Sequence, residues 1–470
     1  MKKWTALLFS LIMLVSLAAS CGGSTATQTT ASTSAAAKND DDKDKDKQEE
    51  TDEASEATES KKENTSSNDG NNVISFWNLG VESPDKEYYQ SSVDAFNANT
   101  ESGYKIETTN IQNDTYKEKL VIAMSSSQCP DLYTSWSGGP MNEYIDAGFA
   151  QPITELVNAS DIKDKIMDAA WAQASYKDEI YALPILNVSI SGVFYNTEMF
   201  EKYDLSVPET VTELEAVCDT LVENGITPFA LANASKWTGS MYFMSLATRK
   251  GGLDPFNAAA DGSGSFENES YEYAGTKIQE WVNKNYFPDG VNSLSEDDGQ
   301  AKQLMYQETA AMLLCGSWYT GTFQSDSPEF YEKIDWFSFP AVEGSDADIS
   351  IQIGTIGDQF LHFNCEGEKL EAAFEFAGYY SKDESVELLL DSAKIPIVKI
   401  DAGKITDPVN QKILQAALNA SSTQLWYDQY LPPAVGEVHK DTCQEIFGLT
   451  QTPEEANKAL NDAMQAYLKG

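Results

Sequence analysis

Five consecutive segments, beginning at Val73, alternate between the residue patterns of strands and helices. Three short runs rich in β-branched and aromatic side chains are typical of strands: residues 73–77, 104–109 and 131–134. Two segments between these runs space their apolar side chains as one face of a helix does: residues 88–98 and 116–125. This alternation predicts an α/β fold with a largely parallel sheet covered by helices.

The length and the N-terminal composition set the number of domains. The chain has 470 residues, which is more than one ordinary domain contains. Residues 22–72 include no Val, Ile, Leu, Met, Phe, Trp or Tyr. Such a segment has no apolar surface to bury, so we expect residues 21–72 to form a disordered tether. The rest of the chain is long enough for two cores.

The first residues resemble an export signal followed by a lipid anchor. Residues 1–20 begin with two lysines and continue with a short apolar run, as a signal peptide does. Small residues then precede Cys21, and this arrangement resembles a bacterial lipobox. The resemblance implies lipid attachment at Cys21, and the alternative is an ordinary signal peptide with an incidental cysteine. We expect a protein anchored by lipid to the outer face of the cell membrane of a Gram-positive bacterium.

The charge and the rare residue types exclude several classes of function. The net charge of −42 repels phosphate backbones and anionic lipid surfaces, so no nucleic acid is expected as a partner. The sequence has one arginine, Arg249, and two histidines, His362 and His439, which we expect to be structural. No cofactor or metal site is expected. In contrast, 9 Trp, 22 Tyr and 20 Phe suit a neutral ligand rich in hydroxyl groups.

The end of the chain has a clear helix signal. Thr452 and Glu455 have the spacing of a capping box, and Pro453 suits the first turn. We expect one buried face of this helix to consist of Ala456, Leu460, Ala463 and Tyr467.

A series of short motifs resembles one protein family. In order, these are PDLY at 130–133, GFAQPI at 148–153, DEIYALP at 178–184, FYNTEMF at 194–200, VPET at 207–210, TPF at 227–229, AAM at 310–312 and GSW at 316–318. Their order and spacing resemble the family 1 extracellular solute-binding proteins, the carbohydrate receptors of bacterial ABC importers. The resemblance covers nearly all of residues 73–470.

This resemblance implies a periplasmic-binding-protein-like fold, in which two α/β lobes joined by a hinge close over a ligand. It implies chain crossings near residues 195–196, 354–357 and 407–410. The N-lobe would then comprise residues 73–194 and 357–408. The C-lobe would comprise residues 195–356 and 409–470.

Aromatic side chains are the first candidates for the binding site, because the C–H face of a sugar stacks on aromatic rings. Trp318 matches the stacking tryptophan that the resemblance implies, and Trp237 matches an aromatic wall. Trp77 ends the first expected strand and Trp136 follows the third, and ligands bind beyond the carboxyl ends of strands in open α/β sheets, although Trp77 is equally suited to the core. Tyr430 lies in an aromatic run before two prolines.

Polar side chains are needed to pair with the hydroxyl groups of a sugar. The candidates are Asn78, Asp131, Asn187, Ser189, Tyr195 and Asp428. Two of them have equally simple alternatives, since Asp131 is placed to cap a strand and Tyr195 to pack at a hinge.

We therefore expect a monomeric substrate-binding lipoprotein that captures a neutral mono- or oligosaccharide and delivers it to the permease of an ABC importer. No catalysis is expected. Two alternatives stay open: a receptor for a polyamine or another cationic solute, and a secreted glycoside hydrolase. A hydrolase needs two carboxylates about 5–9.5 Å apart, and no sequence signature selects such a pair.

Overall fold

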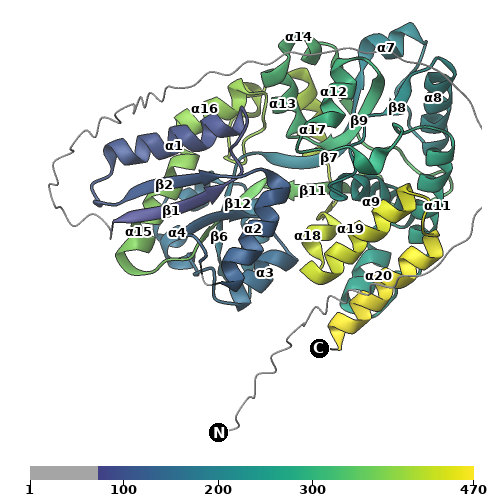
Figure 1. Ribbon diagram of the computed structural model, residues 1–470. Helices are drawn as coiled ribbons and strands as arrows, with labels where there is room; N and C mark the ends of the chain where they lie inside the picture. The colour runs from purple at the N-terminus through teal and green to yellow at the C-terminus, as the bar shows by residue number, and fades with distance from the viewer. Residues whose placement is uncertain (1–71, 127, 470) are drawn as a thin grey trace, which may run out of the picture. The chain divides into compact units, whose positions relative to one another are not determined.

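The computed structural model describes residues 72–126 and 128–469, and it contains two large β-sheets flanked by helices (Figure 1). The expected signal peptide at residues 1–20, Cys21 and almost all of the expected tether therefore lie outside the described residues. Within the described ranges, no helix has both the length and the apolar composition that crossing a lipid bilayer requires.

The first sheet confirms the three strands expected near the start of the folded region. Its strands lie in the order β2-β1-β3-β12-β6. Their bounds are β1 (Val73–Asn78), β2 (Lys105–Asn110), β3 (Leu132–Ser135), β6 (Ala182–Ile185) and β12 (Gln359–Phe363). β1 pairs in parallel with β2 and β3, whereas β12 pairs antiparallel with β3 and β6. The sheet is mixed because β12 enters it from a distant part of the chain.

The second sheet is also mixed. Its strands lie in the order β13-β11-β7-β9-β8, and β10 pairs with β7. Their bounds are β7 (Val188–Asn196), β8 (Thr227–Phe229), β9 (Ala310–Gly316), β10 (Ile334–Phe337), β11 (Gln352–Ile356) and β13 (Thr423–Gln424). All nine residues of β7 are buried, as expected for a central strand covered on both faces.

Helices cover both sheets. With the first sheet lie α1 (Asp85–Asn99), α2 (Asn113–Ser125), α3 (Gly139–Asp146), α4 (Thr154–Ala159), α5 (Ile162–Lys165), α6 (Asp168–Gln173), α15 (Gly367–Ala377) and α16 (Asp383–Asp391). With the second lie α7 (Thr197–Lys202), α8 (Val211–Glu223), α9 (Trp237–Gly251), α10 (Asp254–Asp261), α11 (Glu269–Asn283), α12 (Gln300–Tyr306), α13 (Tyr319–Asp326), α14 (Pro328–Tyr331), α17 (Pro408–Leu418), α18 (Tyr427–Tyr430), α19 (Pro433–Phe447) and α20 (Pro453–Leu468). We call these two assemblies the first-sheet part and the second-sheet part.

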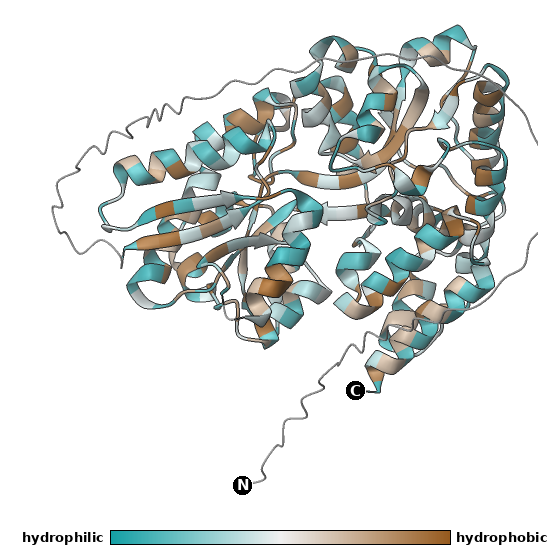
Figure 2. Ribbon diagram, viewed as in Figure 1, coloured by the Kyte–Doolittle hydropathy of each residue, from teal (hydrophilic) through white to brown (hydrophobic). Residues whose placement is uncertain are grey.

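Buried aromatic side chains join the helices to the sheets. In the first-sheet part, Phe76 of β1 packs edge-on against Phe376 of α15, with ring centroids 5.6 Å apart. In the second-sheet part, Trp281 of α11 is fully buried and stacks with Phe229 of β8, with centroids 6.0 Å apart. Figure 2 shows the corresponding alternation of apolar and polar residues along the helices. Each part thus has aromatic core contacts of its own.

The chain passes between the two sheets at places that the strand pairings define. It leaves the first sheet after β6 and enters the second with β7, ahead of the expected crossing at residues 195–196. Tyr195 lies at the far end of β7, inside the second sheet. The return falls between β11 and β12, where the second crossing was expected. The lobe boundaries 73–194 plus 357–408 and 195–356 plus 409–470 stay a prediction.

The C-terminal helix α20 confirms its sequence signal only in part. Thr452 and Glu455 form the capping box, with the Glu455 backbone N–H donating to Thr452 Oγ1 at 3.2 Å. Leu460 is buried as expected. The expectation for Tyr467 is wrong, because this side chain is 50% exposed and Met464 occupies the buried face instead.

Candidate functional site

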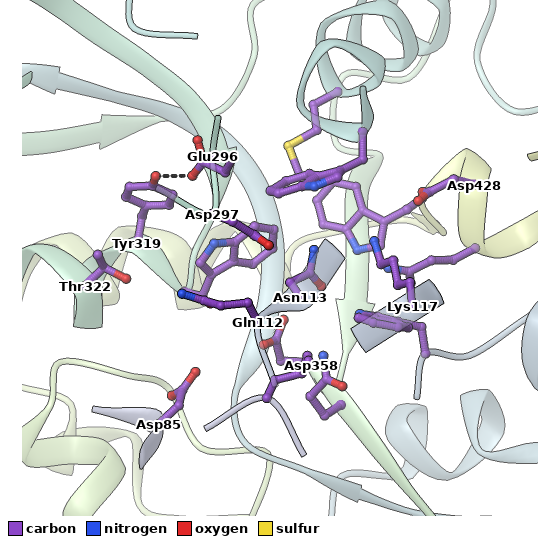
Figure 3. A pocket seen from close by; sticks show the side chains of 18 of the residues that line it. Asp85, Gln112, Asn113, Lys117, Glu296, Asp297, Tyr319, Thr322, Asp358 and Asp428 are labelled. Carbon is purple, nitrogen blue, oxygen red and sulfur yellow. Dashed lines mark hydrogen bonds between the residues drawn. The ribbon is translucent and has the colours of Figure 1, made fainter. Parts of the chain in front are cut away.

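Residues of both parts line a cavity of about 250 Å³ (Figure 3). The first-sheet part contributes side chains that follow its strands: Gln112 and Asn113 after β2, and Trp136 after β3. α2 adds Lys117. The position agrees with the rule that open α/β sheets bind ligands beyond the carboxyl ends of their strands. A hydrogen bond of 2.6 Å from the Tyr116 hydroxyl to the Thr134 carbonyl fixes α2 beside β3.

Four tryptophans form the aromatic walls of the cavity: Trp136, Trp237, Trp318 and Trp426. The Trp318 ring lies 6.0 Å from the Trp426 ring and 6.2 Å from the Trp237 ring. Trp237 begins α9, and Trp318 directly precedes α13. Trp237, Trp318 and Trp426 come from three separate segments of the second-sheet part, whose fold brings them together.

Gly316 makes the orientation of Trp318 possible. A Cβ atom at this position would lie 1.8 Å from Cζ3 of the Trp318 ring, so a larger residue would displace the indole. The space beside Gly316 is therefore filled by the Trp318 ring itself.

Lys117 places a positive charge inside this aromatic group. Its Nζ lies 4.7 Å from the centroid of the Trp136 ring and 5.9 Å from that of Trp237. The ammonium forms no ion pair with any residue between 72 and 469 that the structure describes. Burial lowers the pKa of Lys117, because the charged form loses its hydration.

Carboxyl groups predominate among the charged groups at the cavity. Burial raises the pKa of Glu296 to about 7 and that of Asp358 to about 6, since both carboxylates lose hydration. The Tyr319 hydroxyl donates a hydrogen bond to Glu296 (Figure 3). Asp297 Oδ2 accepts a bond of 2.9 Å from the backbone N–H of Asp114. Asp428 lines the other side of the cavity.

Three buried polar atoms at the cavity have no partner within the described part of the chain. They are Trp237 Nε1, Gln359 Oε1 and Gln429 Oε1. Buried polar atoms of native proteins are nearly always hydrogen-bonded. These atoms supply one donor and two acceptors for a bound solute, in addition to the carboxylates and Lys117.

Four of the site residues expected from the sequence line the cavity: Trp136, Trp237, Trp318 and Asp428. Tyr430 does not, although it is next but one to Asp428. Tyr430 is 41% exposed, and its ring packs edge-on against Phe256, with centroids 4.9 Å apart. The short helix α18 turns Asp428 and Tyr430 in different directions, so the expected pair is not formed.

Three expected residues of the first-sheet part lie elsewhere. Asp131 sits at the amino end of β3, where it accepts bonds of 2.9 Å from the backbone and hydroxyl of Ser75 and pairs with Lys369. The structure thus assigns it the strand-capping alternative. Trp77 packs in a small cluster with Tyr116 and Tyr133. Asn78 is fully buried and accepts a bond from the Gly80 N–H.

Three others are held within β7 or next to it. Asn187 donates to the Val188 carbonyl at 2.9 Å, and Ser189 is fully buried opposite Thr355 of β11. Tyr195 donates to Asp335 at 3.1 Å and packs on the ring of Phe200. These contacts are structural, and none of the three side chains lines the cavity.

Several lining residues were not predicted from the sequence. Gln112 and Asn113 follow β2, and the strand-end rule that selected Trp136 applies to them equally. Asp358 and Gln359 flank the second chain crossing, so the expected position of that crossing was a usable signal. Glu296 and Asp297 lie in an irregular acidic loop, and no periodicity distinguishes them from the many other acidic residues.

The molecule has two α/β parts and a cavity that residues of both parts line. This arrangement defines a periplasmic-binding-protein-like fold. The model of the bacterial extracellular solute-binding protein family matches residues 80–387. This match covers more than half of the chain, which therefore belongs to that family of binding proteins.

Relatives and solved structures agree with this assignment. An uncharacterized ABC transporter extracellular-binding protein of Pyrococcus horikoshii is 25% identical over 75% of this chain and 77% of its own length. A multiple sugar-binding protein of Streptococcus mutans is 25% identical over 59% of this chain and 64% of its own length. A solved protein from work on xylan utilization by Caldanaerobius polysaccharolyticus superimposes with a TM-score of 0.77 and 29% identity, over 83% of this chain and 99% of that one.

Proposed function

We propose that this protein is an extracellular substrate-binding lipoprotein, which captures a neutral mono- or oligosaccharide and delivers it to the permease of an ABC importer. The observation that carries the proposal is the combination of four tryptophan rings with carboxylate and amide oxygens around one cavity. Indole faces stack on the C–H faces of a sugar, and the oxygens accept bonds from its hydroxyl groups. The names of the Streptococcus mutans and Caldanaerobius proteins support a carbohydrate as the solute.

The volume of the cavity supports a short ligand. About 250 Å³ lies just below the range of roughly 300–1,000 Å³ that is typical of pockets for drug-sized ligands. We therefore propose that one or two sugar rings are enclosed, with any longer chain extending outward. Cys21 would be lipidated and residues 21–72 would tether a monomeric receptor to the cell surface.

Two observations keep alternatives open for the test. The excess of carboxylates at the cavity favours a cationic solute such as a polyamine. The raised pKa of Glu296 is a property shared with the general acids of glycoside hydrolases. The unpaired ammonium of Lys117 opposes the first alternative, since it would repel a second cation at the same rings.

The test is calorimetry of the purified protein with a panel of neutral mono- and oligosaccharides, and with spermidine and putrescine. We expect saturable binding of at least one neutral sugar and none of the polyamines. Chromatography of the sugars after prolonged incubation should show them intact. Binding of polyamines alone, or cleavage of the bound sugar, would contradict the proposal.

A further inference from the structure

We propose that Lys117 is a specificity-determining residue, whose ammonium excludes organic cations from the cavity and so reserves it for uncharged solutes. This inference rests on the proposed function, because it explains how an acidic receptor selects neutral sugars. It concerns a side chain that neither the motifs nor the composition of the chain singled out.

The cavity without Lys117 has the features of a cation site. The carboxyl groups at its lining belong to Glu82, Asp85, Glu296, Asp297, Asp358 and Asp428, and its only other lysine is Lys302. Lys302 is already neutralised, since its Nζ lies 3.3 Å from Glu82 and 2.9 Å from Asp326. Aromatic faces together with carboxylates are the groups that recognise organic ammonium ions. Nothing else in this lining would oppose the entry of such an ion.

Lys117 occupies the position that an organic cation would take. Its Nζ lies over the Trp136 ring at 4.7 Å and also faces Trp237 at 5.9 Å. The helix that carries it is fixed, because the neighbouring Tyr116 hydroxyl donates to the Thr134 carbonyl at 2.6 Å. An ammonium ion bound at the same rings would meet this like charge at close range, where repulsion is strong.

A neutral sugar does not experience this repulsion. The ammonium of Lys117 has three N–H donors and no ion-pair partner among the described residues, so it is able to donate to hydroxyl or ring oxygens of a sugar on Trp136. Lys117 therefore acts against one class of solute without acting against the other. Selectivity of this kind requires a repulsive element as well as attractive contacts.

The test measures binding of tetramethylammonium, a permanent cation, by calorimetry to the full folded protein and to three variants. Lys117→Met removes the charge and keeps an unbranched apolar chain, and we expect its affinity for tetramethylammonium to be at least tenfold higher than that of the parent. Lys302→Met is the matched control, because it changes the net charge equally at an already paired lysine. We expect a much smaller gain from it. Lys117→Arg keeps the charge and should exclude the cation as the parent does.

A second measurement uses the parent protein alone and covers the case in which Lys117→Met fails to fold. Charged groups near Lys117 are Asp114 on its own helix, Asp297 of the second-sheet part, and Asp428, Glu437 and Lys440 from the C-terminal segment. Raising the pH from about 8.5, where Glu296 and Asp358 are already ionised, should deprotonate Lys117 while tetramethylammonium keeps its charge. The affinity for tetramethylammonium should therefore rise over this range in the parent and not in Lys117→Arg.

The outcomes separate the two proposals. If the parent binds a neutral sugar, but neither Lys117→Met nor high pH improves tetramethylammonium binding beyond Lys302→Met, the role of Lys117 is refuted and the proposed function stands. If the parent itself binds tetramethylammonium and no neutral sugar, the proposed function fails as well. A gain restricted to Lys117→Met supports the inference.

Discussion

At the residue scale, burial shifts the pKa values of the two histidines and of the carboxyl groups at the cavity. The two histidines are fully enclosed, and burial lowers the pKa of His362 to about 3 and that of His439 to about 4. His362 stacks on Tyr133 with centroids 5.0 Å apart, and His439 contacts the Ser240 hydroxyl at 2.7 Å. Both side chains are thus buried inside the fold, as expected for structural histidines. Burial also disfavours the charged form of the carboxyl groups at the cavity, and for these groups it raises the pKa.

Glu296 should make stability depend on pH. Its pKa rises from 4.5 to about 7 on folding, because burial disfavours the carboxylate. The stabilising contribution is complete below pH 4.5 and is lost as the pH rises through 7. We expect Glu296→Gln, which cannot ionise, to lose about 2 kcal/mol less unfolding free energy than the parent between pH 5 and pH 8. Urea denaturation at both pH values measures this, with Glu371→Gln on the exposed face of α15 as control. Equal pH profiles for parent and Glu296→Gln would contradict the burial argument.

Trp318 and Trp281 should separate binding from folding. Truncating a ring that stacks on a sugar removes on the order of 2 kcal/mol of binding, so Trp318→Ala should raise the dissociation constant more than tenfold. Trp281 is fully buried in the core, and Trp281→Ala should reduce the free energy of unfolding by roughly 3–5 kcal/mol. Calorimetry and thermal melting on both variants test this. An early melt for Trp318→Ala with normal sugar binding would show that its ring supports the core instead.

At the element scale, the helix α2 lacks a cap from its own sequence. Its N-cap residue Gln112 makes no side-chain cap bond, and Asp297 of the second-sheet part accepts from the Asp114 N–H instead. α20, in contrast, is capped from its own sequence, since the Thr452 side chain accepts a hydrogen bond from the Glu455 N–H. A cap formed within one segment, such as that of α20, was predictable from the sequence. The Asp297 contact was not, because 183 residues separate the partners.

We expect Asp297→Ala to weaken sugar binding more than folding. The bond to α2 joins the two parts, and a helix cap contributes about 1 kcal/mol, so the dissociation constant should rise about fivefold. Thr452→Ala removes a cap within one part and is the matched control. It should reduce the free energy of unfolding by about 1 kcal/mol and leave affinity unchanged. Calorimetry measures the dissociation constant and urea denaturation the free energy of unfolding of both variants. Equal changes of both quantities in the two variants would contradict a role of the Asp297 bond in joining the parts.

At the scale of the whole molecule, the α/β class and the first three strands followed from local periodicity, whereas the allocation of strands to sheets did not. β7 begins only after Leu186 and Asn187, yet it belongs to the second sheet, where it pairs with β9, β10 and β11. Those partners lie far along the chain, and no pattern inside β7 identifies them. Trp136 was predictable because it follows a strand of the local alternation, whereas Glu296 lies in an irregular loop between η1 (Val291–Ser293) and α12 and at no strand end.

The approach of the two parts at Gly139 gives a test of closure. Gly139 begins α3 of the first-sheet part, and a Cβ atom there would lie 2.2 Å from the Leu431 carbonyl oxygen of the second-sheet part. Gly139→Ala should therefore hold the parts apart without disturbing either core. We expect the parent to contract in small-angle scattering when a bound sugar saturates it, and Gly139→Ala to keep its unliganded radius of gyration.

The affinity of Gly139→Ala for the sugar should fall at least tenfold, because contacts from one of the two parts are lost. Gly378→Ala is the control, since its added methyl group would meet only the Ile162 side chain, at an ordinary contact distance of 3.4 Å. That variant should contract and bind as the parent does. Normal contraction and affinity in Gly139→Ala would mean that the backbone at Leu431 yields to the methyl group, and the close approach of α3 to Leu431 would then play no part in closure.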